Sequence, residues 1–258
     1  MKKSISIIIY AHNDENNIKE CIKSAKLITE NVCLIDIASS DRTIDFALKQ
    51  NEDVKRVGFV KYVELVRQIG IDFADSDWIL ILDADERITK ESAKEIKNAI
   101  KNNKITYYFI PRKNIFDGVK WLKHGGWWPD LQIRLIRKKY LKKWPKEIHS
   151  APIIQGAFEK LKNPLIHSFH GNITKMVEKT LIFEDVESDL LYKADKNVTT
   201  LTFLRKFLGE FFRRFLKNLG FLDGPIGIIE SIYQAFSKTI TFLLLYEKKN
   251  NRTVRSIS

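Results

Sequence analysis

The sequence predicts an α/β fold, in which a mostly parallel sheet is flanked by helices and is followed by a basic helical extension. Two observations carry this prediction. Short β-branched runs alternate with helix-length stretches over residues 5–102, as expected for parallel strands joined by crossover helices. Residues 201–258 show a different pattern, in which apolar and basic side chains recur at helical spacing. We therefore expect an α/β domain over residues 1–200 and a helical tail over residues 201–258.

The order of apolar runs and polar breaks places the elements of the first domain. We expect strands over residues 5–10, 32–36, 54–60, 78–82 and 106–111, and helices over residues 15–27, 44–50, 62–73, 90–102 and 174–193. Loops that follow parallel strands meet at one edge of a sheet, which is where open α/β sheets bind their ligands. Asp14, the loop 36–41 and the pair Asp83 and Asp85 are therefore expected to share one rim.

The bulk composition is that of a folded, basic protein. The chain has 258 residues, of which 44% are apolar and 29% charged, and its net charge is +12. Residues 201–258 hold ten Lys or Arg residues against four acids. This balance favours an acidic partner, such as nucleic acid, anionic lipid or anionic glycolipid, and charge alone does not choose among them.

The cysteines and the N-terminus indicate a reducing compartment. Cys21 and Cys33 are too few for a disulfide framework, so we expect two reduced core thiols. The first apolar run is broken at residues 11–14 and is too short for the core of a signal peptide. We therefore expect a cytosolic protein.

The stretch 78–86 is the strongest chemical signal in the sequence. Five large apolar residues end in a D-x-D triplet, Asp83 and Asp85, followed by Glu86. Two carboxylates at such close range would repel each other unless a positive group lay between them. A divalent metal that itself carries the phosphates of a nucleotide is one candidate for that group. The alternative is a solvated turn before the next helix, since Thr89 has the character of a helix start.

Residues 121–128 are unusual because they contain three tryptophans and two glycines. This composition is typical of a mobile or irregular loop over a site. A hydrophobic plug between sheet and helices is the alternative.

The tail predicts association with a membrane surface. Residues 201–217 present a wide Phe and Leu face bordered by arginine and lysine, which is typical of a helix in a membrane interface. Residues 226–246 are apolar but contain Glu230, Gln234 and Lys238, which favours a second interfacial or packed helix over a membrane-spanning one. The alternative is that both helices pack on the enzyme or on a partner subunit.

Four motifs stand in order along the chain: residues 6–10 with Asn13 and Glu15, residues 36–43, Arg67, and residues 78–86. In order and spacing they resemble the family 2 glycosyltransferases, which have a GT-A fold. Residues 126–130, residues 132–135 and a later segment at 147–149 are similar to the branch that builds the lipopolysaccharide inner core, which includes the β-1,4-glucosyltransferases.

The resemblance implies an inverting hexosyltransferase that depends on Mg²⁺ or Mn²⁺. The expected reaction moves glucose from UDP-glucose to a membrane glycolipid such as lipopolysaccharide core, at the inner face of the cytoplasmic membrane. A metal at this site would neutralise the charge that develops on the departing diphosphate. The metal ligands implied are Asp83, Asp85 and His149.

The resemblance also assigns roles to the remaining site residues. Asp130 is the expected base, because the acceptor hydroxyl needs a proton acceptor as it attacks the anomeric carbon. Gln132 and Arg134 belong to the acceptor or diphosphate side. The positions expected to bind the nucleotide are Tyr10, Asn13, Glu15, Asp36, Asp41, Arg67 and Asp83.

The chain departs from the pattern of its relatives at three positions. Arg42 replaces a common glycine, Gln68 an asparagine and Ser150 an acid, and the last of these weakens the assignment of His149. Two other functions remain open, a basic nucleic-acid-binding protein and a non-catalytic membrane scaffold. No nucleic-acid-binding module is recognisable, so we expect no nucleic-acid partner.

Overall fold

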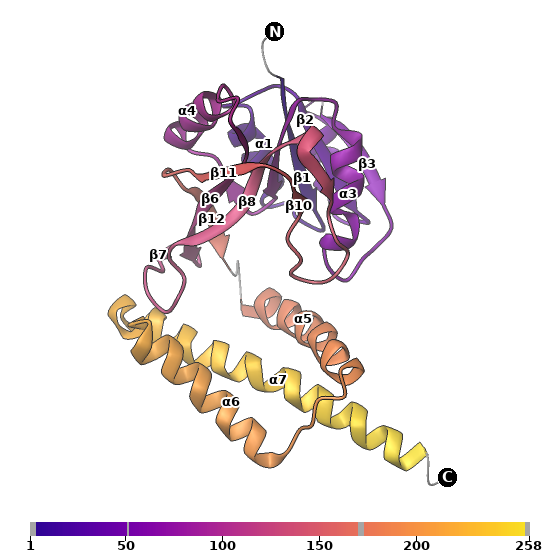
Figure 1. Cartoon of the computed structure of the whole chain (residues 1–258), viewed down its shortest axis with the longest axis vertical. Helices are drawn as coiled ribbons and strands as arrows, with labels where there is room; N and C mark the ends of the chain where they lie inside the picture. The colour runs from indigo at the N-terminus through magenta and orange to yellow at the C-terminus, as the bar shows by residue number, and fades with distance from the viewer. Residues whose placement is uncertain (1–3, 51, 170–172, 256–258) are drawn as a thin grey trace. The chain divides into compact units, whose positions relative to one another are not determined.

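The computed structural model describes residues 4–50, 52–169 and 173–255 (Figure 1). The chain divides into two compact units. The first unit comprises Met1–Asn114 and Pro129–Ser168, and the second comprises Ile115–Trp128 and Phe169–Ser258. The division falls at residue 168 rather than at the expected residue 200, and a short inner segment belongs to the second unit.

The predicted α/β class is confirmed, and the first half of the first unit is a four-stranded parallel sheet in the order β3-β2-β1-β4. Its strands are β1 (Ile5–Ala11), β2 (Val32–Ile37), β3 (Asp53–Val57) and β4 (Trp78–Asp83). The helices that follow them are α1 (Ile18–Ala25), α2 (Thr43–Leu48), α3 (Glu64–Phe73) and α4 (Lys90–Ala99). Each predicted element is present, with its ends shifted by a few residues.

The register of these strands aligns their carboxyl ends. Ala11 lies opposite Asp36, and Tyr10 lies opposite Asp83. The strands β1, β2 and β4 consist almost entirely of buried residues, which is why they read as continuous apolar runs. The aspartates at residues 36 and 83 therefore lie at the same edge of the sheet, as predicted.

The second half of the sheet is mostly antiparallel, which confirms the expected mixed sheet, although the sequence does not predict which strands pair in this way. β8 (Asp130–Arg137) pairs antiparallel with β4 and with β6 (Ile105–Phe116). The order continues β4-β8-β6-β12-β5, with β5 at Glu86–Arg87 and β12 at Leu165–Phe169. β7 (Lys120–Trp121) and β11 (Ala157–Lys160) also pair with β6. After a 3-10 turn (Lys138–Tyr140), β9 (Leu141–Lys143) pairs with β10 (Ile153–Ile154) in a separate two-stranded sheet.

Residues 130–137, for which the sequence analysis predicts no element, form the strand β8. Their sequence alternates polar and apolar positions, with Leu131, Ile133 and Leu135 two residues apart. That period is the strand signal. The signal was hidden because the segment carries charged residues and follows directly on the glycine- and tryptophan-rich stretch.

Gly70 of α3 allows this helix to pack closely on β1. A Cβ atom at this position would overlap the Tyr10 hydroxyl and the Ile8 side chain. We expect Gly70→Ala to lower the free energy of unfolding by about 1–3 kcal/mol, because an overpacked site must shift its neighbours. Urea unfolding measures the change. Gly58→Ala is the matched control, since nothing lies within 4 Å of its added Cβ, and an equal loss in both variants would contradict the packing explanation.

The second unit consists of helices and one tryptophan-rich loop. Its helices are α5 (Ile173–Lys193), α6 (Thr200–Phe212), a π-helical turn (Arg213–Lys217), a 3-10 turn (Gly220–Asp223) and α7 (Pro225–Arg255). The Glu184 carboxylate of α5 accepts hydrogen bonds from Ser237 and Thr241 of α7. Lys248 of α7 lies 2.8 Å from the Asp185 carboxylate. These contacts explain why α5 groups with the tail.

The tryptophan-rich loop is fixed to the helices of its own unit. The backbone N–H groups of Lys123 and His124 both donate to one carboxylate oxygen of Asp223, at 2.9 and 2.8 Å. The His124 ring lies 2.8 Å from the other oxygen, and Gly125 N–H donates to the Asn218 carbonyl at 2.7 Å. The loop is therefore held by hydrogen bonds within the second unit.

α7 is long and apolar enough over Pro225–Asn250 to cross a membrane, by length and composition only. In its most apolar stretch 44% is buried within the structure, so packing explains much of this apolar character. Burial raises the pKa of the Glu230 carboxyl on this helix to about 7.

Candidate active site

The loops after β1 and β2 are hydrogen-bonded to each other at the rim of the sheet. The Asn13 side-chain oxygen accepts from Ser40 N–H at 2.8 Å, and Asn13 itself has a left-handed backbone with φ of 52°. The Asp41 carboxylate accepts from Glu15 N–H at 3.0 Å and from Thr43 N–H at 2.9 Å. Asn13 and Asp41 thus shape the rim.

Asp36 lies at the end of β2 and is fully buried. One of its carboxylate oxygens accepts from Ser39 N–H at 3.2 Å and lies 3.4 Å from Nε of Arg56. Among the residues that the structure describes, the other oxygen has no hydrogen-bond partner. A buried acceptor of this kind calls for a donor, and a ribose hydroxyl or the N–H of a base is a suitable one.

Only some of the hydrogen-bond donors of Arg67, on α3, have an acceptor among the described residues. Its carbonyl accepts from the Tyr10 hydroxyl at 2.6 Å, and its guanidinium lies 4.6 Å from the centre of the Tyr10 ring. Nη2 lies 2.8 Å from Asp83, whereas Nε and Nη1 have no acceptor among the described residues. Burial raises the pKa of the Tyr10 hydroxyl, so this residue stays a neutral donor.

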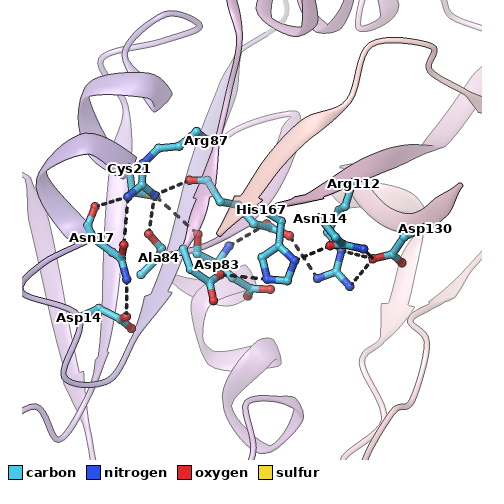
Figure 2. A network of polar contacts seen from close by, with 12 residues as sticks. Asp14, Asn17, Cys21, Asp83, Ala84, Arg87, Arg112, Asn114, Asp130 and His167 are labelled. Atoms are coloured by element: carbon cyan, nitrogen blue, oxygen red, sulfur yellow. Dashed lines mark hydrogen bonds and ion pairs between the residues drawn. The ribbon is translucent and has the colours of Figure 1, made fainter. Parts of the chain in front are cut away.

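A chain of alternating charges runs from this rim across the antiparallel strands. Arg134 of β8 lies 2.5 Å from Asp83 and 2.5 Å from Glu86. Arg112 of β6 continues the chain, at 3.4 Å from Glu86 and 2.7 Å from Asp130 (Figure 2). Each carboxylate in the chain therefore lies against at least one guanidinium.

These ion pairs show that two guanidinium groups supply positive charge beside Asp83, where a metal was the expected candidate. Arg67 and Arg134 occupy both oxygens of Asp83. Burial alone would raise the pKa of Asp83, but these two guanidinium groups hold it well below its ordinary value. A cation beside Asp83 would meet two positive groups, so the geometry favours Asp85 as the cation ligand of the pair.

Asp130 begins β8 and accepts several hydrogen bonds. Gln132 donates to one oxygen at 2.7 Å, whereas Arg112 and Asn114 donate to the other at 2.8 and 3.2 Å. Burial alone would raise the pKa of Asp130, but these donors and the charge of Arg112 lower it. The residue is ionised and can accept a proton, and Gln132 contacts it directly.

His149 lies in an exposed turn with a left-handed backbone, and its N–H donates to the Glu64 carboxylate at 3.1 Å. Among the described residues, no group of three or more His, Cys, Asp or Glu side chains could hold a metal ion. The structure thus does not assemble the expected set of Asp83, Asp85 and His149. Among the described residues, His167 of β12 lies beside Asp85, with Nε2 at 3.6 Å from its carboxylate.

Residues 6–162 match the family described as Glycosyl transferase family 2. The chain belongs to this family. A curated relative, an uncharacterized glycosyltransferase of Rickettsia typhi, is 24% identical over 257 residues, which cover 95% of this chain and 87% of the relative. A similar protein of Rickettsia conorii is 23% identical and covers 96% of this chain and 91% of its own length.

Two solved structures confirm the GT-A-like fold of this glycosyltransferase. S. aureus TarS 1-349 in complex with UDP-GlcNAc has a TM-score of 0.51 at 14% identity, covering 96% of this chain and 92% of TarS 1-349. The mannosyltransferase PcManGT from Pyrobaculum calidifontis, in complex with GDP-Man and Mn2+, has a TM-score of 0.51 at 10% identity, covering 92% of this chain and 74% of that one.

The three departures from the family pattern have local partners in this glycosyltransferase. The exposed Arg42 side chain lies 3.3 Å from Glu15. The Gln68 side chain accepts from Trp144 N–H at 2.9 Å, and the Ser150 hydroxyl donates to the Pro145 carbonyl at 2.7 Å. None of these three contacts involves Asp83 or Asp85.

Sequence reasoning missed Arg112, Asn114, Arg56 and His167. Arg112 and Asn114 share one face of β6, two residues apart, beyond the expected end of that strand at residue 111. Extending the strand pattern could have found both. Nothing in the local sequence distinguishes His167 as a site residue.

The site should make this glycosyltransferase sensitive to acid. Asp83 and Asp130 both have lowered pKa values in the folded protein. Their contribution to the free energy of unfolding is therefore complete above about pH 4, the ordinary pKa of an aspartate, and is lost as pH falls through the lower pKa values of the folded protein. We expect the free energy of unfolding to be unaffected by these two groups between pH 5 and 7 (about one unit above the ordinary pKa) and to fall below about pH 4. Urea unfolding across this range tests it, and Asp83→Asn should flatten the acid fall.

Proposed function

We propose that this glycosyltransferase moves a sugar from a nucleotide donor to a membrane glycolipid, with inversion at the anomeric carbon. UDP-glucose is the first donor to test and lipopolysaccharide core is the first acceptor, because the glucosyltransferases of the lipopolysaccharide inner core, which the sequence resembles, would use this pair. The observation that supports this proposal most directly is that two buried residues with unused hydrogen-bonding atoms, Asp36 and Arg67, lie at the same edge of the sheet. An acceptor and a donor of hydrogen bonds at one rim suit a nucleoside and its phosphates.

The two solved neighbours support the choice of donor. TarS was crystallised with UDP-GlcNAc, and PcManGT with GDP-Man and Mn2+. A carboxylate and an imidazole beside each other, Asp85 and His167, are ligands that Mn²⁺ or Mg²⁺ accepts together with diphosphate oxygens. When bound, the cation would neutralise charge on the departing diphosphate.

The remaining work falls to residues of the chain itself. Asp36 accepts a hydrogen bond from the base or ribose, and Arg67 directs its two unused donors toward the phosphates. Asp130 accepts the proton of the attacking hydroxyl, and Gln132 holds its carboxylate. Arg134 takes a structural role instead of the predicted substrate contact, because it is buried between Asp83 and Glu86.

The direct test is sugar transfer. We would incubate the protein with Mn²⁺ or Mg²⁺, a lipid A core acceptor and radiolabelled UDP-glucose, and in parallel with UDP-galactose, UDP-GlcNAc or GDP-mannose. We expect label in the lipid fraction with one donor and none without added cation. Absence of both transfer and donor hydrolysis with every donor would contradict the proposal and favour a non-catalytic scaffold, as would cellular glycolipid that is unchanged by Asp85→Asn.

Asp36→Asn is expected to weaken UDP binding by about 10–100-fold, because a charged hydrogen bond to the nucleoside is lost and an amide donor replaces one acceptor. Isothermal titration calorimetry with UDP and Mn²⁺ measures the change. Asp45→Asn, at an exposed position of α2, is the control and should bind as wild type. Equal affinities for wild type and Asp36→Asn would remove Asp36 from the nucleotide site.

The tail supports a location on the membrane. Five large apolar residues of α6 and the turn after it are exposed and recur at intervals of three or four residues. They are Leu201, Leu204, Leu208, Phe212 and Leu216. An exposed apolar stripe on a helix rich in Lys and Arg suits the headgroup region of an anionic bilayer. We propose that this stripe holds the enzyme on the inner face of the cytoplasmic membrane, where a lipid-linked acceptor is at hand.

Vesicle flotation tests the location. We expect the protein to float with vesicles of phosphatidylglycerol and phosphatidylcholine, and to float less with phosphatidylcholine alone. The triple substitution Leu204→Gln, Leu208→Gln and Phe212→Gln should abolish flotation, whereas Leu48→Gln, at an exposed apolar position of the first unit, should not. A wild-type protein that stays unbound to both vesicles but sediments as an oligomer would assign the stripe to a partner subunit instead.

A further inference from the structure

One side of α4 carries lysines at positions 90, 94 and 97, and a fourth, Lys101, follows in the turn after the helix. At 3.6 residues per turn, the first three lie within about 60° of one another around the helix axis. All four side chains are exposed, and they line one surface hollow of about 440 Å³. The other lining residues of this hollow are Leu27, Ala93 and Asn98, none of which is acidic. We call these four lysines the α4 ridge.

The acids of α4 do not neutralise the α4 ridge. Within the part of the chain that the structure describes, none of the four lysines forms an ion pair, and Lys101 reaches only the Asn98 side-chain oxygen, at 3.2 Å. The Glu95 carboxylate instead accepts from the backbone N–H groups of Lys162 and Asn163, at 2.9 and 2.8 Å. Lysines four residues apart on a helix repel each other, and a cation in the first turn opposes the helix dipole. The ridge therefore destabilises its own helix, and an anionic partner would offset this repulsion.

α1 repeats the same spacing on its exposed side. Its lysines line a second hollow of about 410 Å³, together with one lysine of the segment after α2. The four are Lys19, Lys23, Lys26 and Lys49. Glu20 lies 3.8 Å from Lys23, and Glu52 lies 2.7 Å from Lys26, so this hollow is partly neutralised. The α4 ridge is therefore the part of the lysine-rich surface with the most unbalanced charge.

The two sets of lysines belong to one face of the molecule. α1 and α4 cover the same side of the sheet, because buried residues of both helices, such as Ile22 and Ile96, join one core cluster with β1 and β4. Leu27, two residues after α1, lines the hollow of the α4 ridge, so the two helices are neighbours across it. At 1.5 Å per residue, the α4 ridge extends over about 16 Å. The first unit thus presents a broad basic face rather than a single row of charges.

We propose that this face is a second membrane contact, which binds the phosphate headgroups of an anionic bilayer. A plane of negative charge matches cations that are spread over two neighbouring helices, and each lysine near such a surface adds to the attraction. Lysine is a compact charge without the planar fork of arginine, so the face is poorly suited to specific recognition of a nucleic acid. Leu27, which is 37% exposed, adds an apolar side chain between the helices.

Two weak contacts together give the firm attachment that one alone does not, and the apolar stripe of α6 would be the other contact. The inference rests on the membrane location proposed above, but it does not depend on sugar transfer.

The test measures the partition of the full-length protein onto vesicles of phosphatidylglycerol and phosphatidylcholine by flotation. One variant changes the α4 ridge to glutamine: Lys90→Gln, Lys94→Gln, Lys97→Gln and Lys101→Gln. At about 0.1 M salt we expect its partition coefficient to fall by about 10–100-fold. At about 1 M salt the difference should vanish, because the screening length shortens from about 10 Å to about 3 Å. Glutamine and lysine have similar helix propensities, so the variant should fold, and thermal unfolding checks this.

A matched control removes the same charge from four other exposed lysines of the first unit. Its substitutions are Lys55→Gln, Lys142→Gln, Lys143→Gln and Lys146→Gln. We expect this control to bind vesicles within about threefold of wild type, because these lysines lie outside both hollows. An equal loss in the two variants would show that net charge alone acts, and would overturn the proposal.

Two further outcomes would also overturn it. One is a ridge variant that binds the vesicles as wild type does. The other is a ridge variant that keeps its vesicle binding but loses a salt-sensitive gel shift with single-stranded DNA, because the face would then serve a nucleic acid. A wild type that binds no vesicle would remove both proposed membrane contacts. Transfer of sugar to an acceptor dispersed in detergent is measured separately, and the ridge variant should keep the wild-type rate there.

Discussion

Asp130→Asn is expected to lower kcat for sugar transfer by about 10²–10⁴-fold while leaving KM for the donor near its wild-type value. The amide oxygen can still accept from Arg112, and the amide NH₂ can donate to Gln132 once the Gln132 side chain turns its own oxygen toward it, so the strand geometry should survive. It cannot take the proton of the attacking hydroxyl. Initial rates at varied donor concentration measure both constants, with Asp75→Asn, at an exposed position of the first unit, as the control.

The pH profile gives a second readout for the same residue. Because the pKa of Asp130 lies below its ordinary value, its protonation should not limit kcat/KM between pH 5 and 8 (at least about one unit above the ordinary pKa). A variant that retains its kcat would exclude Asp130 as the base. It would direct attention to another acid near the acceptor.

Arg134→Met is expected to lower the free energy of unfolding by about 3–5 kcal/mol. The substitution leaves the carboxylates of Asp83 and Glu86 without the guanidinium that lies between them, and Glu86 is fully buried. Urea unfolding at pH 7 measures the loss. Arg137→Met, on the same strand but only partly buried, should cost less than about 1 kcal/mol.

A double-mutant cycle isolates the cause. Adding Glu86→Gln to Arg134→Met removes one of the stranded charges, so we expect the double variant to recover part of the lost stability. Strictly additive losses would show that Arg134 acts through packing alone.

The parallel half of the sheet could be predicted because its strands are buried on both faces and consist of continuous apolar runs. The rim could be predicted too, since the ends of parallel strands coincide. The antiparallel half could not be predicted, because β8 has no continuous apolar run and its buried Arg134 looks like a surface residue in the sequence. Burial of an arginine depends on its partners, which the local pattern does not record.

The roles of single site residues were the hardest to predict. Asp83 is neutralised by Arg67 and Arg134, which lie 16 and 51 positions away in the sequence. The position of His167 beside Asp85 likewise depends on which strand pairs with β5, and β12 follows it only after several intervening elements of the chain. The resemblance identified the correct family. The contacts that site residues such as Asp83 make were visible only in the fold.

The chain passes between its two compact units three times, after residues 114, 128 and 168. Asp223, just before α7, anchors residues 123 and 124, which are inserted between strands of the sheet along the sequence. A truncated protein that ends before residue 200 would therefore leave a tryptophan-rich loop without its anchor and expose it to self-association. A recombinant that takes its C-terminal helices from a relative must for the same reason take residues 115–128 from that relative too.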